Sequence, residues 1–230
     1  MLPTYNEAEN IVALVRELRS LGCEVLVVDD NSPDGTAQLV RELAKSDWGV
    51  HLLVRTEDRG RGRAGRDGFV KAMELGADCI VEMDADFSHR PQDIPALVAA
   101  LADADIAVGS RLVAGGSDGE RGFLRRWLTL ASTGLARSLL GVRIRDVNSG
   151  FRAYRRSALE AIEPSSLRAA GPEIVAEVLA RSREKHLRLA EVPIVFARRK
   201  AGTSKLTLGK LLKVLWFIIW GRKHGQSSGD

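Results

Sequence analysis

The fold of this chain is decided by the stretch Cys79-Ile80-Val81-Glu82-Met83-Asp84-Ala85-Asp86. Its first part, Cys79–Met83, is a short and mostly apolar run, which predicts a buried β-strand. Two carboxylates, Asp84 and Asp86, follow that strand directly. Because ligands of open α/β sheets bind at the carboxyl ends of the strands, we expect both aspartates at a ligand-binding edge.

Short apolar strands and amphipathic helices alternate on both sides of this stretch. The predicted strands are Glu24–Val28, Val50–Val54, Cys79–Met83 and Ile106–Val108. The predicted helices are Glu7–Leu21, Thr36–Lys45, one that follows Arg63 and ends near Leu75, and Asp93–Ala102. This alternation predicts an α/β fold with a mainly parallel central sheet flanked by helices.

Three charged loops follow predicted strands and should meet at one edge of the sheet. They are Asp29-Asp30, Asp84-Ala85-Asp86 and Gly109-Ser110-Arg111. Two carboxylates two residues apart can share one hard divalent cation, Mg²⁺ or Mn²⁺, which keeps waters and binds substrate phosphates. The same pattern also occurs in solvated turns and helix N-caps, but the second acidic pair favours the metal site. A metal beside a diphosphate indicates a nucleotide-activated donor.

The second half of the chain is less regular, and no linker separates it from the first. Its expected elements are a helix at Phe123–Leu140, a strand at Ser149–Tyr154, a helix at Pro172–Lys185, and extended segments at Leu187–Val192 and Ile194–Ala197. We expect one domain over residues 1–205, a helix over 206–223 and a polar tail over 224–230. Only Met1 and Leu2 precede Pro3, so either the sheet lacks most of its first strand or the natural chain starts upstream.

The composition is that of an ordinary globular protein. The chain has 230 residues, of which 45% are hydrophobic and 28% charged, and this excludes disorder over most of its length. Only 5% are aromatic, and the basic residues interleave with acidic ones, so we expect no nucleic-acid partner. Two cysteines and four histidines supply neither a disulfide framework nor a Cys-rich zinc site.

Several motifs carry positive charge. Residues Gly60–Gly65 match G-x-G-x-x-G, but they follow a later strand than a dinucleotide site requires, so we interpret Arg55–Arg63 as a flexible, arginine-bearing loop near anions. The other basic candidates suit either phosphate contacts or solvated loops, and they are Arg111, Arg199 and Lys205. Arg125 and Thr129 lie one helical turn apart and can address one ligand together.

The C-terminal segment combines apolar and basic residues. Leu211–Trp220 is largely apolar, with basic residues on both sides, yet as a helix it covers roughly 15 Å, about half of a hydrocarbon core. No run of about 20 apolar residues exists, so no transmembrane helix is expected. The helix over 206–223 can pack on its own domain, lie in a membrane interface, or dock on a transmembrane partner.

Taken together, the motifs resemble those of the polyprenol-phosphate mannosyltransferases, also called dolichol-phosphate mannose synthases, in family 2 of the glycosyltransferases. The similar stretches run in order along nearly the whole chain, and they are Leu2–Glu7, Asp29–Thr36, Met83–Pro91, Gly109–Arg111, Asp146–Tyr154 and Val192–Leu206. The resemblance implies a GT-A fold over residues 1–205. In such a fold, a nucleotide-binding α/β domain is joined to an acceptor side built from the C-terminal half.

The resemblance also implies roles for individual residues. The guanosine part of a donor would contact Pro3, Tyr5, Glu7, Val28 and Asp30. Mg²⁺ or Mn²⁺ and the diphosphate would be held by Asp84, the Ala85 carbonyl and Asp86, with Ser88 standing where some relatives have a glutamine ligand. Donor phosphates would be bound by Arg111, Arg199 and Lys205, and the acceptor phosphate by Arg111, Arg125 and Thr129.

The implied activity is metal-dependent transfer of mannose from GDP-mannose to a polyprenyl (dolichyl-type) monophosphate, with inversion, for glycan or lipoglycan assembly. The catalytic residues would be Asp86, Arg111 and Lys205. Thr129 keeps the hydroxyl of the family's Arg-x-x-x-Ser, whereas Thr133 departs from the Asn that follows it.

The lipid acceptor determines the location that we expect for the protein, and two alternative functions are also considered. A polyprenyl phosphate stays in the bilayer, so we expect peripheral association with the inner, cytoplasmic face of the membrane, alone or with a separate transmembrane subunit. One alternative is a UDP-glucose-dependent polyprenyl-phosphate glucosyltransferase. Another is a non-catalytic, membrane-docked binding protein on the same scaffold.

Overall fold

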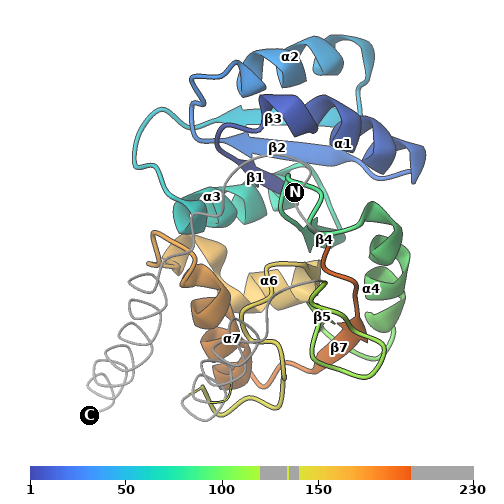
Figure 1. Ribbon diagram of the computed structural model, residues 1–230. Helices are drawn as coiled ribbons and strands as arrows, with labels where there is room; N and C mark the ends of the chain where they lie inside the picture. The colour runs from blue at the N-terminus through green and yellow to red at the C-terminus, as the bar shows by residue number, and fades with distance from the viewer. Residues whose placement is uncertain (120–133, 135–139, 198–230) are drawn as a thin grey trace.

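The computed structural model describes residues 1–119, 134 and 140–197, and Figure 1 shows their arrangement. Several predictions concern other residues and lie outside the described part. They are nearly all of the helix at Phe123–Leu140, the side chains of Arg125, Thr129, Arg199 and Lys205, and the helix and tail over 206–230.

The first half of the chain builds a parallel sheet. Its strands lie in the order β1 (Leu2–Thr4), β2 (Val25–Asp29) and β3 (Val50–Val54). The register pairs Leu2 with Val27, and Val25 with Val50. The helices of this half are α1 (Ala8–Ser20), α2 (Thr36–Ser46) and α3 (Arg61–Glu74). The predicted alternation of strands and helices is confirmed here.

Strand β2 divides the core because its successive side chains point to opposite faces of the sheet. Val25 and Val27 belong to the apolar cluster that also contains residues of α1 and α2. Leu26 and Val28 belong to the second cluster, with residues of α3. The two faces of the sheet are therefore covered by α1 and α2 on one side and by α3 on the other (Figure 1).

The second sheet contains an antiparallel strand that the sequence pattern did not specify. Its order is β4 (Cys79–Glu82), β6 (Arg152–Arg155), β5 (Ile106–Ser110) and β7 (Leu189–Pro193). Strand β6 is antiparallel to both β4 and β5, and β7 is parallel to β5. Strands β4 and β5 therefore run in the same direction.

The two sheets meet where β4 lies beside the start of β1. The Met1 nitrogen donates to the Val81 oxygen at 2.8 Å, and the Met83 N–H donates to the Met1 oxygen at 3.3 Å. This pattern is that of a parallel pair, so β1, β2, β4 and β5 direct their carboxyl ends to one edge. Strand β1 has three residues.

The remaining helices lie between or after the strands of the second sheet. Helices α4 (Ile94–Ala100) and α7 (Ile174–Glu184) confirm the predictions at Asp93–Ala102 and Pro172–Lys185. Helix α6 (Arg156–Ile162) was not predicted, because it has only seven residues and follows β6 at once. Two short 3₁₀ turns complete the described part, at Pro91–Asp93 and Pro164–Ser166.

The segment that follows β7 returns to the edge where the strands end. Val195 forms a parallel bridge with Ser117, and the Ala197 N–H donates to the Ser88 oxygen at 2.9 Å. This places the chain after β7 next to the turn that follows β4. Within the described ranges, none of the helices combines the length and the apolar character needed to cross a bilayer.

Candidate active site

The turn after β4 holds the two predicted metal-binding carboxylates in a defined shape. Phe87 adopts a positive φ of 62°, which reverses the chain inside the turn. The Ser88 N–H donates to Asp86 Oδ1 at 3.0 Å, and the Ser88 hydroxyl donates to the same oxygen at 2.5 Å. Asp86 is therefore a buried carboxylate whose orientation is fixed by its own turn.

The donor set of this turn fits a hard divalent cation. The side chain of Asp84 is 36% exposed, whereas Asp86 and Ser88 are buried. Among residues 1–119, 134 and 140–197, no group of three or more His, Cys, Asp or Glu side chains is placed to hold a metal. Two carboxylates beside an open edge match the binding mode of Mg²⁺ and Mn²⁺, in which waters and substrate phosphates supply the other oxygens.

A buried histidine supports the turn from behind. His89 Nδ1 accepts the Asp84 N–H at 3.0 Å. Its ring stacks on Phe151 with centroids 4.8 Å apart, and Phe196 meets it edge-on at 5.4 Å. Burial lowers the pKa of His89, although the charges of Asp84 and Asp86 act in the opposite direction. The neutral imidazole can therefore accept this hydrogen bond at neutral pH.

An arginine of α3 links the turn to a buried acid of β4. Arg61 Nη1 lies 2.7 Å from Glu82 Oε1, and its Nη2 lies 3.8 Å from Asp84 Oδ1. The hydroxyl of Tyr154 donates to the other Glu82 oxygen at 3.2 Å, and burial raises the pKa of this tyrosine. The charge of Arg61 is therefore shared between a structural carboxylate and a candidate metal ligand.

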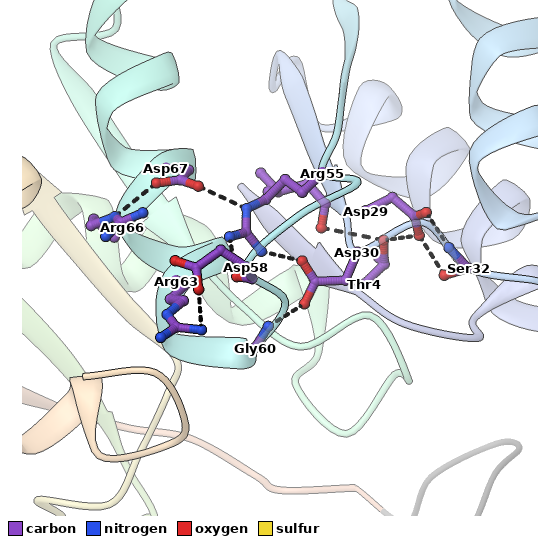
Figure 2. A network of polar contacts seen from close by, with 11 residues as sticks. Thr4, Asp29, Asp30, Ser32, Arg55, Asp58, Gly60, Arg63, Arg66 and Asp67 are labelled. Carbon is purple, nitrogen blue, oxygen red and sulfur yellow. Dashed lines mark hydrogen bonds and ion pairs between the residues drawn. The ribbon is translucent and has the colours of Figure 1, made fainter. Parts of the chain in front are cut away.

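The acidic pair after β2 is engaged by the protein itself (Figure 2). Asp29 is fully buried and accepts bonds from the Thr4 hydroxyl at 2.8 Å and the Ser32 N–H at 2.8 Å. Asp30 accepts the Gly60 N–H at 2.8 Å and forms an ion pair with Arg55. These contacts tie the end of β2 to β1 and to the start of α3.

The arginine-bearing loop is more ordered than the sequence suggested. Helix α3 begins at Arg61, so most of the G-x-G-x-x-G stretch is helical rather than a loop. Arg55 also pairs with Asp67 at 2.7 Å, and Arg63 pairs with Asp58 (Figure 2). The predicted end of the loop at Arg63 is thus wrong, because the helix begins at Arg61, and Arg55, Arg61 and Arg63 contact carboxylates of the protein.

The glycines of this stretch serve close packing of main chains. The Gly62 N–H donates to the Ala170 oxygen at 2.9 Å. A Cβ atom at Gly62 would collide with the main-chain oxygens of Ala169 and Gly171. The first turn of α3 can therefore lie against the segment before α7 only when this residue has no side chain.

The predicted nucleoside-binding residues lie in β1 and β2 or on the segments that follow these strands, and the two segments are bonded to each other. The main-chain N–H groups of Asn6, Glu7 and Ala8 donate to side chains of the loop after β2 at 2.9–3.0 Å, and the acceptors are Ser32, Thr36 and Asp34. Tyr5 is 41% exposed, and Pro3 is half-buried. The Val28 side chain is buried in the core, so Val28 can present only its main chain to a ligand.

Arg111, at the end of β5, is held by buried acids. Its Nε and Nη2 lie 2.7 and 2.8 Å from the two oxygens of Asp146, and its Nη1 lies 3.4 Å from Asp118. Burial alone would lower the pKa of Arg111, but Asp146 more than offsets this, so the pKa is raised. The N–H of Asp146 in turn donates to Glu191 of β7 at 3.0 Å.

The structure brings together three of the described residues that the sequence singled out. Asp84, Asp86 and Arg111 all contribute to the electrostatic environment of His89, so they share one neighbourhood. Sequence reasoning missed the supporting residues, which are Arg55, Arg61, Glu82, His89 and Asp146. Two sequence features could have pointed to these residues. They are the position of His89, three residues after Asp86, and the position of Asp146 in the polar stretch before β6.

Comparison with known proteins places this chain among sugar-transferring enzymes. A family model described as glycosyl transferase family 2 matches residues 1–163. The chain is 39% identical over 211 residues to a protein of Micrococcus luteus named undecaprenyl-phosphate mannosyltransferase, with 91% of this chain and 87% of that protein covered. It is 38% identical over 226 residues to a polyprenol monophosphomannose synthase of Mycolicibacterium smegmatis, with 96% and 85% covered.

Solved structures agree on the fold. A glucosyl-3-phosphoglycerate synthase from Mycobacterium tuberculosis, crystallised with Mn²⁺, uridine diphosphate and phosphoglyceric acid, superposes with a TM-score of 0.69. The match covers 100% of this chain and 78% of that one at 20% sequence identity. Likeness at this identity shows the fold alone, and that fold is the GT-A fold.

Proposed function

The chain belongs to glycosyltransferase family 2, and on this premise we propose that it transfers mannose from GDP-mannose to the phosphate of a polyprenyl monophosphate with inversion. The observation that carries the proposal is the rigid acidic turn Asp84–Asp86, which lies at the same sheet edge as Arg111 and the loops after β1 and β2. The names of the two similar proteins reported above indicate which sugar and which lipid acceptor we propose.

The acidic turn is the proposed position of the donor diphosphate. Asp84 and Asp86, with the Ala85 carbonyl and Ser88 in the same turn, would hold Mg²⁺ or Mn²⁺. A divalent ion bound there would neutralise charge on the departing nucleoside diphosphate. The solved relative crystallised with Mn²⁺ and uridine diphosphate has the same fold, which supports a divalent ion in this chain as well.

On the acceptor side, the protein has to orient the lipid phosphate rather than remove a proton from it. A lipid phosphate is already ionised near neutral pH, so its oxygen can attack without a strong general base. Arg111 stays charged at the edge and is fixed by Asp146, which suits it to hold a phosphate for in-line attack. Arg125, Thr129, Arg199 and Lys205 remain proposed phosphate-binding residues on the basis of the sequence, and a single displacement inverts the sugar carbon.

A transfer assay with two donors tests this function. The purified full-length chain is incubated with a short polyprenyl phosphate, Mn²⁺ and radiolabelled GDP-mannose or UDP-glucose. We expect lipid-linked mannose from GDP-mannose, loss of product with a chelator and recovery with added Mn²⁺. If product forms only with UDP-glucose, the donor is UDP-glucose and the proposed GDP-mannose donor is wrong. Absence of product from either donor, with membranes supplied, would favour a binding protein.

We also propose that the protein associates peripherally with the cytoplasmic face of the membrane, where the acceptor phosphate lies. The sequence supports this through the apolar run Val214–Trp220 with basic residues on both sides, a combination favoured in membrane interfaces. A separate transmembrane subunit is a further proposed partner.

Sedimentation with vesicles that contain anionic lipid tests this association. We expect the full-length chain to pellet with the vesicles and a variant lacking residues 206–230 to stay in the supernatant. Circular dichroism of both proteins controls for folding. Equal pelleting of the two proteins would show that the C-terminal segment does not provide the attachment.

A further inference from the structure

His89 is a buried polar side chain that connects the acidic turn to other parts of the protein. It belongs to the same turn as Asp84 and Asp86, and its side chain is 3% exposed. Two aromatic rings from distant parts of the chain contact it, Phe151 just before β6 and Phe196 after β7. The ring therefore has little freedom to rotate, and its Nδ1 atom stays directed at the Asp84 N–H.

The hydrogen bond at Asp84 closes the turn from one end. Ser88 closes it from the other, through its two bonds to Asp86 Oδ1. Without an acceptor at position 89, the Asp84 N–H would lose its hydrogen bond to Nδ1. A main-chain N–H that loses its acceptor favours a shift of the main chain toward another partner, and the Asp84 carboxylate would move with it.

We propose that His89 is a positioning residue that fixes the Asp84 main chain, and through it the Asp84 carboxylate, in the geometry that a divalent ion requires. This inference rests on the proposed function, because it assigns a support to the proposed metal site. Groups behind the ligands of metal sites commonly act in this way, and their loss weakens metal binding by about 10–100-fold.

Two substitutions by side chains of similar shape separate the effect of the His89 hydrogen bond from the effect of the ring packing. Asparagine in His89→Asn can place its side-chain oxygen near the position of Nδ1, and it lacks the ring. Leucine in His89→Leu has the same branched shape and also lacks the ring, but it accepts no hydrogen bond. Loss of ring packing affects both variants, so a difference between them reports the hydrogen bond alone.

Metal binding and amide exchange are measured on the full-length chain. Electron paramagnetic resonance of free Mn²⁺ gives the metal affinity, without and with GDP. We expect His89→Leu to bind Mn²⁺ about 10–100-fold more weakly than wild type, and His89→Asn to stay close to it. In the metal-free protein, we expect the Asp84 amide to exchange faster with solvent in His89→Leu than in His89→Asn.

The outcomes distinguish this inference from the proposed function. Equal Mn²⁺ affinity and equal Asp84 exchange in the two variants would overturn the positioning role. If metal affinity instead follows the thermal stability of the variants, His89 acts through packing and the inference is also overturned. A wild-type chain that binds no Mn²⁺ would contradict the proposed metal site, while the exchange measurement would still decide the role of His89.

Discussion

Replacing Asp86 with asparagine or alanine should reduce sugar transfer by about a thousandfold or more. A metal that polarises a leaving group contributes several kcal/mol, and about 4 kcal/mol corresponds to that factor. Asp86→Asn keeps an oxygen that can accept the two Ser88 hydrogen bonds and removes only the charge, whereas Asp86→Ala removes both. We therefore expect both variants to lose transfer and Asp86→Asn to keep the shape of the turn.

Initial rates of mannose transfer at saturating Mn²⁺ measure this loss. The matched control is Asp103→Ala, which removes an exposed carboxylate from the loop between α4 and β5. We expect the control to transfer at the wild-type rate. Wild-type activity in Asp86→Asn would show that the turn needs only the hydrogen bonds of this residue, and not its charge.

Replacing Asp146 with alanine should destabilise the protein by about 3–5 kcal/mol, because removing one partner of a buried ion pair leaves the other charge uncompensated. Asp146 is fully buried and accepts both the Arg111 side chain and its main-chain N–H. Asp118, at 3.4 Å, would remain as a weaker partner of Arg111. Transfer should also fall, because Arg111 would lose its orientation.

Urea denaturation of three variants measures this effect. The unfolding free energies of Asp146→Ala, Arg111→Met and the double variant form a cycle in which the shared ion pair is counted once. We expect the double variant to be less destabilised than the sum of the two single variants. If the decreases in unfolding free energy are additive, or if Asp146→Ala lowers it by less than about 1 kcal/mol, the ion pair contributes no more than a surface salt bridge does.

The parts of the fold that could be predicted are those with a local pattern. The apolar runs Glu24–Val28 and Cys79–Met83 predict buried strands that end before acidic residues. The structure confirms them as β2 and β4, with bounds that differ by one residue. The antiparallel insertion of β6 between β4 and β5 depends on a return of the chain across the domain. No local periodicity encodes such a return, so the order of the strands could not be derived.

The same distinction holds for the candidate site. The Asp84–Asp86 turn is contiguous and was found from the sequence. The Arg111–Asp146 pair joins residues 35 positions apart, and Arg61 and Glu82 are 21 positions apart. These pairs are set by packing between elements, so the arginines of the loop after β3 looked available to ligands although most of them face protein carboxylates.

The most direct test of the central claim is the binding of Mn²⁺ to the wild-type chain and to Asp86→Asn, followed by electron paramagnetic resonance in the presence of GDP. If the two aspartates after β4 hold a cation beside the donor diphosphate, the wild-type chain should bind Mn²⁺ more tightly with GDP than without it. Asp86→Asn should then lose most of that binding while its thermal unfolding remains unchanged. Equal Mn²⁺ binding by the two proteins would contradict the assignment of this turn as the metal site.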